Sequence, residues 1–230
     1  MMIGALVDAG VPLTPIVEHL KCLGLVGYTL KVWRAQTHGF AGTRFMVDLT
    51  REHSQEAHRT WEDIFQIITG SNLPLQIIKS SLMIFEKLAQ AEARIHGVPL
   101  EKVHFHEVGA LDSIVDIVGT AIALHGAGIE KIYCSPIPTG YGYIRTAHGL
   151  LPIPAPATAE LLKGLPIRSV EVEGELVTPT GAALVATLVE GFGLPPAMRI
   201  GQIGYGLGSN VYRFPNFLRV FIGEELFEIL

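Results

Sequence analysis

The sequence predicts an α/β fold: a layered mixed sheet with flanking helices, preceded by a small N-terminal α+β region that contains a hairpin. Strand-like and helix-like segments alternate in the C-terminal half of the chain. Apolar residues recur every three or four positions in Leu75–His96, which is the period of an amphipathic helix. Hydrophobic residues make up 49% of the 230 residues and charged residues only 17%, so the chain can bury a large core.

The N-terminal part is predicted to cover residues 1–59 and to begin with two short helices. The first helix ends at Gly10, because glycine adopts the backbone conformation that closes a helix. Thr14 and Pro15 resemble an N-cap and a first helical residue, and they predict a second helix that reaches Leu23.

A hairpin is expected next, because Tyr28–Ala35 and Thr43–Thr50 are rich in valine, threonine and aromatic residues. The loop between them would include residues 38–42. The polar linker that follows contains His53 and His58, whose spacing suits neither one helix face nor one strand face. We interpret it as a solvated linker; the alternative is a weak site for loading metal.

The main part is predicted to cover residues 60–230 and to start with helices. Thr60 and Asp63 have the spacing of a capping box, so they predict a helix that ends at Gly70. Leu75–His96 is the clearest helix of the chain. Later elements are predicted from shorter patterns. They are a helix through about Leu124, a strand at Lys131–Ser135, a long loop at Pro136–Pro156, a helix at Ala157–Lys163, strands at Val170–Val177, a helix at Gly181–Glu190, and strands at Met198–Gly201 and Phe217–Ile222.

The glycine-rich segment Gly201–Asn210 is predicted to be a flexible hairpin between the last two strands. It lacks the strand and helix context of a dinucleotide-binding loop, and it lacks the lysine of a P-loop.

Composition excludes several classes of function. The net charge is −5 and no basic run occurs, so nucleic acid is not an expected partner. No run of about 18 apolar residues predicts a membrane span, and no secretion signal opens the chain. Cys22 and Cys134 are far apart and form neither a disulfide framework nor a CxxC pair, which favours the reducing cytoplasm.

The segment 103–119 carries the strongest chemical signal, because polar side chains interrupt an apolar stretch. Five side chains are predicted metal ligands: His104, His106, Glu107, Asp112 and Asp116. Asp112 and Asp116 are four residues apart and would share one face of a helix. A divalent cation would offset their repulsion and lost hydration. The alternative is that Asp112 caps a helix that starts at Ser113 and Asp116 is solvent-exposed.

Two further segments are predicted to bind an anion. Arg145 and His148 lie in a proline-rich frame that ends near Thr158, where a helix N-terminus would offer free N–H groups. Because this frame is stiff, we expect both side chains to face the same cavity as the predicted metal ligands. The alternative for this segment is a stiff connector with a surface histidine. In the second segment, Thr178, Thr180 and Gly181 stand where a strand leads into a helix; Thr180 could cap that helix. Phosphate or carboxylate binding and simple capping explain the threonines of the second segment equally well.

Three segments in this order resemble the LarC family: HFHEVGALDSIVDIVG, AHGLLPIPAPAT and GELVTPTGAAL. Together they are highly specific, and the likeness spans nearly the whole chain. Members are nickel insertion proteins that complete the nickel-pincer cofactor of lactate racemase and related enzymes.

The resemblance implies insertion of nickel into pyridinium-3,5-bisthiocarboxylic acid mononucleotide, with two Ni–S bonds and one Ni–C bond formed. It implies a nickel chelatase or cyclometallase of the lyase class that uses CTP and a divalent ion such as Mn²⁺. Bond formation at carbon requires loss of a ring proton, so we infer acid–base roles for His106, Glu107 and His148. Arg145, Thr158, Thr178, Thr180 and Gly181 would then bind the nucleotide-like precursor.

The sequence also departs from the family pattern. We expect a strand before Met2 and a C-terminal domain after Leu230 to lie outside this chain, and the CTP site with them. The chain would therefore bind nickel or the precursor and need that C-terminal domain for turnover; a second copy of the chain, in a homo-oligomer, is a further candidate partner. Two other functions stay open: a non-catalytic nickel metallochaperone module, and a divalent-metal-dependent hydrolase of a phosphorylated small molecule.

Overall fold

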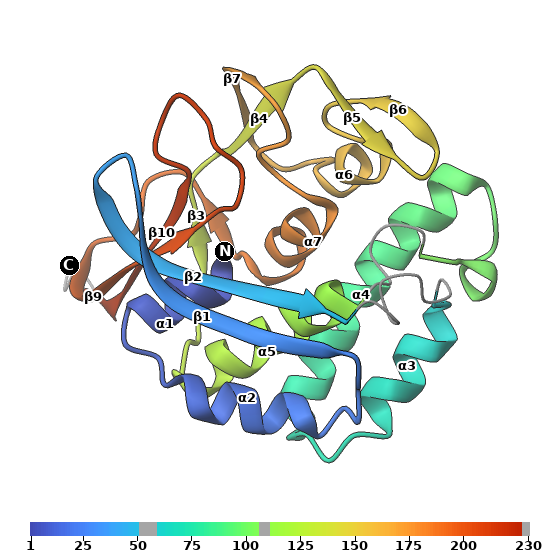
Figure 1. The fold of residues 1–230 in the computed structure, drawn as a ribbon, viewed down its shortest axis with the longest axis horizontal. Coiled ribbons are helices and arrows are strands. Elements are labelled where there is room, and N and C mark those ends of the chain that lie inside the picture. The colour runs from blue at the N-terminus through green and yellow to red at the C-terminus, as the bar shows by residue number, and fades with distance from the viewer. Residues whose placement is uncertain (51–58, 106–110, 227–230) are drawn as a thin grey trace.

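The computed structural model describes residues 1–50, 59–105 and 111–226, and it confirms a mixed α/β fold (Figure 1). The helices are α1 (Met2–Asp8), α2 (Leu13–Lys21), α3 (Trp61–Thr69), α4 (Leu75–His96), α5 (Leu111–Gly126), α6 (Pro156–Leu161) and α7 (Pro179–Leu188), with a 3-10 turn at Leu100–Lys102. The strands are β1 (Tyr28–Thr37), β2 (Phe40–Leu49), β3 (Tyr133–Cys134), β4 (Ile137–Tyr141), β5 (Tyr143–Thr146), β6 (Gly149–Pro152), β7 (Ile167–Glu173), β8 (Gly191–Phe192), β9 (Met198–Leu207) and β10 (Phe217–Glu225). None of the described helices is both long enough and apolar enough to cross a membrane.

The largest sheet has the strand order β1-β2-β9-β10, so it combines strands from both predicted parts of the chain. The predicted hairpin is confirmed, but its loop is shorter than expected. Only His38 and Gly39 connect β1 to β2, and both have positive φ angles, 49° and 82°. Such a two-residue turn matches the twist of the strands, so regular pairing continues to Thr37 and Phe40.

The glycine-rich segment is not the flexible hairpin that its composition predicts. Its first seven residues, to Leu207, belong to β9, which pairs antiparallel with β10 and parallel with β2. Helix α1 lies directly on this strand. A Cβ atom added at Gly204 would lie 2.0 Å from the carbonyl oxygen of Ala5, and one added at Gly206 would lie 2.0 Å from that of Met1. These glycines therefore allow the helix backbone to pack against the sheet.

Asp8 fixes α1 to the sheet, and sequence reasoning did not identify it. Its carboxylate accepts hydrogen bonds from the Thr43 hydroxyl at 2.7 Å and from the Tyr205 backbone N–H at 2.9 Å. Arg34 forms an ion pair with the same carboxylate. Three strands are thereby tied to one helix, because Arg34, Thr43 and Tyr205 belong to β1, β2 and β9.

Helix α5 is the centre of the core. It contacts α1, α2, α4, α7 and β2, and most of its residues are buried. A helix that is apolar on nearly all sides belongs inside a protein. Gly119 allows the side chain of Ile3 on α1 to pack closely against it. The position of α5 therefore depends on the position of α1.

Helices α3 and α4 confirm the predictions from local pattern. The Thr60 hydroxyl accepts from the Asp63 N–H at 3.1 Å, and the Asp63 carboxylate accepts from the Thr60 N–H at 2.8 Å, as a capping box requires. The start of α2 was predicted wrongly, since Pro12 takes the N-cap position and not Thr14. Pro15 then falls in the first turn, where its missing N–H would have had no helical partner.

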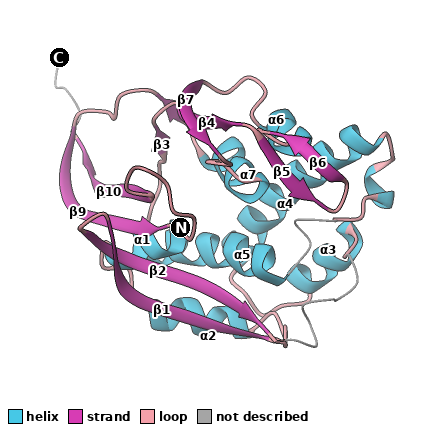
Figure 2. Cartoon of the chain, turned by 45° about the horizontal axis from the view of Figure 1, so that its top comes forward, coloured by secondary structure: helices cyan, strands magenta, loops and turns pink. Residues whose placement is uncertain are grey.

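The prediction of one long loop at 136–156 is wrong. This segment forms β4, which pairs in parallel with β7, and the hairpin of β5 and β6. Prolines are tolerated because each of these sheets has only two strands, so every strand has an edge that needs no ladder bond. Figure 2 shows α4, α5 and α7 between these small sheets and the four-stranded sheet.

Candidate functional site

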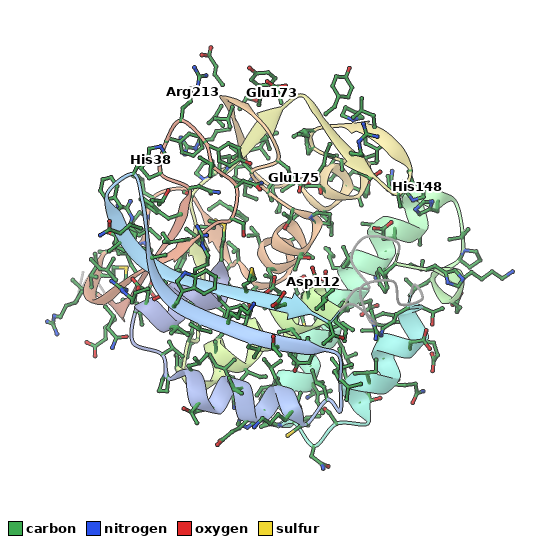
Figure 3. The ribbon with its side chains drawn as sticks, viewed as in Figure 1. His38, Asp112, His148, Glu173, Glu175 and Arg213 are labelled. Atoms are coloured by element: carbon green, nitrogen blue, oxygen red, sulfur yellow. The ribbon has the colours of Figure 1, made fainter. Side chains whose placement is uncertain are left out.

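A cavity of about 260 Å³ lies where the N-terminal end of α5 meets the connection from β7 to α7. Its described lining residues come from four parts of the chain: Asp112, Ser113, Asp116, Ile144, Ala155, Glu175, Thr178, Pro179 and Thr180. We call this cavity the carboxylate pocket. It brings the predicted metal-binding aspartates together with two of the predicted phosphate-binding threonines. Figure 3 shows that Asp112 and Glu175 come from separate elements in the middle of the molecule.

The two aspartates of α5 share the helix face that their spacing predicts, because both line the pocket. Asp112 lies in the first turn and is exposed, and its carboxylate accepts a hydrogen bond from the Ser113 N–H at 2.8 Å. Because α5 starts at Leu111, Asp112 is its second residue and not the cap of a helix that starts at Ser113. Asp116 is partly buried one turn further along the helix, so it is not the solvent-exposed residue of that alternative either.

The environment of Asp116 favours its neutral form. Burial raises the pKa of Asp116, the α-amino group of Met1 opposes this rise, and the negative charge of Asp112 adds to it. A carboxylate that has lost hydration next to another carboxylate gains from a bound cation or from a proton. We therefore expect the charge state of Asp116 to respond to a cationic ligand.

Glu175 is a third carboxylate in the pocket, and sequence reasoning missed it. It follows β7 and precedes the N-cap of α7, where only the threonines and Gly181 were considered. Its backbone carbonyl accepts a hydrogen bond from the Tyr212 hydroxyl at 3.0 Å, which holds this connection in place. No local pattern indicated Glu175, because it reaches the pocket only through the packing of the connection from β7 to α7 against the start of α5.

The start of α7 differs in detail from the prediction. Thr178 is the N-cap, and its hydroxyl accepts the Gly181 N–H at 3.2 Å, so Thr180 does not cap the helix. The Gly181 N–H already donates a hydrogen bond to Thr178, which weighs against the predicted role of Gly181 in phosphate binding. Pro179 has no N–H, whereas Thr180 brings an N–H and a hydroxyl to the pocket wall.

The remaining predicted anion-binding residues do not line the carboxylate pocket. Ile144 on β5 does line it, and because strand side chains alternate, the next residue Arg145 points away and is exposed. His148 lies in the turn between β5 and β6, beside His96 at the end of α4 (Figure 3). Thr158 is fully buried in α6. The sequence predicts that Arg145 and His148 face the cavity of the aspartates, but neither is among its described lining residues.

The predicted metal ligands are only partly brought together. His104 is exposed and forms an isolated β-bridge with Thr60, next to the start of α3 and outside the lining of the carboxylate pocket. Within the described residues, no group of three or more His, Cys, Asp or Glu side chains is arranged to hold a metal ion. Four candidate ligands lie outside the described residues: His53, His58, His106 and Glu107.

A second, larger cavity of about 550 Å³ lies between α1, α5, α7 and β10. Its described walls are mainly aliphatic, and an ion pair between Lys131 and Glu225, 2.7 Å long, forms part of them. None of the site residues predicted from the sequence is among its described lining residues. The larger cavity also has acidic residues in its lining, but the aspartates predicted to bind a cation line the smaller carboxylate pocket.

Comparison with known proteins gives a consistent result. A family described as "Nickel insertion protein" matches residues 1–228. The chain is 50% identical over 226 residues to a "Putative nickel insertion protein" of Citrifermentans bemidjiense, covering 98% of this chain and 58% of that protein. It is 48% identical over 233 residues to the "Pyridinium-3,5-bisthiocarboxylic acid mononucleotide nickel insertion protein" of Geobacillus kaustophilus, covering 98% of this chain and 57% of that protein.

A protein of the same description from Desulfitobacterium hafniense is 48% identical over 224 residues, which are 97% of this chain and 55% of that protein. The chain thus spans a little more than half the length of these curated relatives. No solved structure matches it.

Proposed function

The chain belongs to the nickel insertion protein family, and we propose that it takes part in inserting nickel into pyridinium-3,5-bisthiocarboxylic acid mononucleotide. In this proposal the carboxylate pocket receives the nickel ion and the ring end of the precursor, and the reaction is that of a nickel chelatase or cyclometallase. The observation that carries the proposal is the meeting of Asp112 and Asp116 with Glu175 and the start of α7 in one cavity.

The charges of the pocket suit a cation. Its described lining residues include two aspartates and one glutamate and no lysine or arginine. Both Ni²⁺ and a pyridinium ring are positive, and carboxylate oxygen is a ligand that divalent ions accept. The three carboxylates are not arranged as a closed metal site, so we propose that they attract and orient the ion while sulfur atoms of the precursor complete its coordination.

The size of the pocket indicates which part of the precursor enters it. A cavity of about 260 Å³ is smaller than the roughly 300–1,000 Å³ of typical ligand sites. We propose that the ring with its thiocarboxylates enters and that the sugar and phosphate stay outside. The N–H and hydroxyl groups of Thr180 can then bind an anionic oxygen at the start of α7.

The reaction also needs a proton acceptor. The Ni–C bond replaces a C–H bond of the ring, so one proton has to leave the ring carbon when the Ni–C bond forms. We propose the ionised form of Asp116, stabilised by the nearby cation, as the acceptor, because burial raises the pKa of this carboxyl group and so makes its carboxylate a stronger base than that of an ordinary aspartate. His106 and Glu107 remain proposed acid–base groups, whereas His148 lies outside the pocket lining and is better placed for another role.

CTP and Mn²⁺ enter the proposal through the family resemblance. An acidic cavity of this size does not suit a triphosphate, so we propose that CTP binds away from the carboxylate pocket. Assembly with a further domain of the same protein or with a second copy of this chain would supply such a site. The cysteines at positions 22 and 134 are free thiols, which fits a reaction in the reducing cytoplasm.

Glu175→Gln provides the test, with Glu173→Gln as a matched control. Glu175 lines the pocket, whereas Glu173 lies two residues earlier on β7 and is exposed (Figure 3). Equilibrium dialysis with Ni²⁺ in the presence of the precursor should show about tenfold weaker binding for Glu175→Gln, which is about 1.4 kcal/mol, and no change for Glu173→Gln.

Mass spectrometry of the precursor after incubation with nickel and CTP separates binding from insertion. In one outcome, nickel binding depends on Glu175 while the chain itself inserts no nickel into the precursor, whether it is tested alone or together with a full-length relative. That result would indicate that the chain is a nickel carrier. If Glu175→Gln folds normally and binds nickel as the wild type does, the carboxylate pocket is not the nickel site.

A further inference from the structure

Two histidines that are far apart in the sequence meet at the end of α4. His96 is the last residue of α4, and His148 lies in the turn that joins β5 to β6. Their ring centroids are 5.0 Å apart and the ring planes are inclined at 43°. Neither histidine is among the described lining residues of the carboxylate pocket, and Figure 3 shows His148 well apart from Asp112. The pair is therefore a separate cluster of potential metal ligands.

A buried carboxylate stands behind this pair. Glu92 lies one helical turn before His96 and its side chain is only 9% exposed. Oε2 of Glu92 is 3.4 Å from Nε2 of His96. A carboxylate at this nitrogen favours the tautomer that carries hydrogen on Nε2, so the lone pair of the ring is on Nδ1. This is the arrangement by which carboxylates orient metal-binding histidines.

The separation of the rings suits one shared ion. A metal lies about 2.1 Å from an imidazole nitrogen, which places it roughly 3.2 Å from the ring centroid. Two rings with centroids 5.0 Å apart can then bind the same ion at an N–metal–N angle of roughly 100°. That angle is between those of octahedral and tetrahedral coordination. The separation of the two rings is therefore compatible with one shared ion.

We propose that His96 and His148 bind a divalent transition-metal ion, with Glu92 as the residue that positions His96. Imidazole nitrogen suits Ni²⁺ and Zn²⁺, and other ligands would complete the coordination. This site is distinct from the carboxylate pocket and does not depend on the function proposed for that pocket. In a nickel-handling chain it gives a second place where the ion can be held.

The test compares His96→Asn and His148→Asn with His125→Asn. His125 is a suitable control because it is exposed and also lies in the last turn of a helix. Competition between the protein and a chromogenic chelator for Ni²⁺, and separately for Zn²⁺, gives the number and affinity of sites. We expect each of the first two variants to lose one bound ion or to bind it at least about tenfold more weakly, and His125→Asn to behave as the wild type.

Two further measurements identify the ligands of the bound ion and distinguish this site from the carboxylate pocket. X-ray absorption of the nickel-loaded wild type should show imidazole ligands, and their number should fall in His148→Asn. Because the Glu175→Gln variant keeps both histidines, it should retain this site even if the carboxylate pocket is lost. The proposal is wrong if the number and affinity of bound ions are the same in wild type, His96→Asn and His148→Asn, or if only the pocket variants lose metal.

Discussion

Replacing Gly206 with valine should destabilise the protein by at least about 3 kcal/mol, because the new side chain occupies the space of the α1 backbone. A Cβ atom at this position would already lie 2.0 Å from the carbonyl oxygen of Met1 and 2.6 Å from the backbone nitrogen of Ala5. Backbone atoms cannot rotate away, so α1 has to move off the sheet. For a chain of this length, the Tm should fall by roughly 6–12 °C.

Gly201→Ala is the matched control on the same strand. A Cβ atom at Gly201 would meet its nearest neighbour, the carbonyl oxygen of Ile222, at 3.5 Å, which is an ordinary contact. We expect a change in unfolding free energy of less than about 1 kcal/mol. Because α1 packs on α5, Gly206→Val should also displace the two aspartates and weaken nickel binding. Equal stability of the two variants in urea unfolding would contradict the packing described for α1.

Asp116→Asn should weaken nickel binding and yet stabilise the protein at neutral pH. Burial raises the pKa of Asp116 above that of an unfolded aspartate, so the folded chain holds a proton more tightly than the unfolded chain does. Stability therefore falls as the pH rises from the unfolded pKa through the folded pKa, and the penalty persists at neutral pH. Asparagine has no charge to bury. The Tm of the variant at pH 7 should rise, while its affinity for Ni²⁺ should fall by about tenfold or more.

Asp63→Asn is a control for which the expected change in Tm at pH 7 has the opposite sign. Hydrogen bonds from the backbone and side chain of Thr60 lower the pKa of Asp63, so its charged form stabilises the fold. That stabilisation is present above the unfolded pKa and is lost as the pH falls through the folded pKa. Asp63→Asn should therefore lower the Tm at pH 7 and leave nickel binding unchanged. A lower Tm for Asp116→Asn at pH 7, with unaltered nickel affinity, would show that Asp116 has a structural role.

The sequence predicted those features that depend on neighbouring residues. The capping box of Thr60 and Asp63 and the helix Leu75–His96 are formed by contacts within one turn or one helix face, so local pattern was sufficient. The common face of Asp112 and Asp116 follows from helix geometry alone.

Features that depend on contacts between distant segments could not be predicted in this way. In the sequence, Gly204 and Gly206 resemble loop residues and predict a flexible hairpin. They belong to a strand, and glycine is required there because α1 packs directly on β9. Arg145 was expected to face the aspartates because β5 was not recognised as a strand, and the alternation of its side chains directs Ile144 to the pocket instead. Glu175 joins the two aspartates only because the connection from β7 to α7 lies against the start of α5.

The most direct measurement of the central proposal is an anomalous difference map from crystals of the chain grown with Ni²⁺ and the precursor. Data collected on both sides of the nickel absorption edge locate the ion without reference to any assumed chemistry. We predict a nickel peak in the carboxylate pocket, within reach of Asp116 and Glu175, and its loss in Glu175→Gln crystals grown in the same way. Nickel bound with the precursor at another place, with the carboxylate pocket empty, would contradict the proposal.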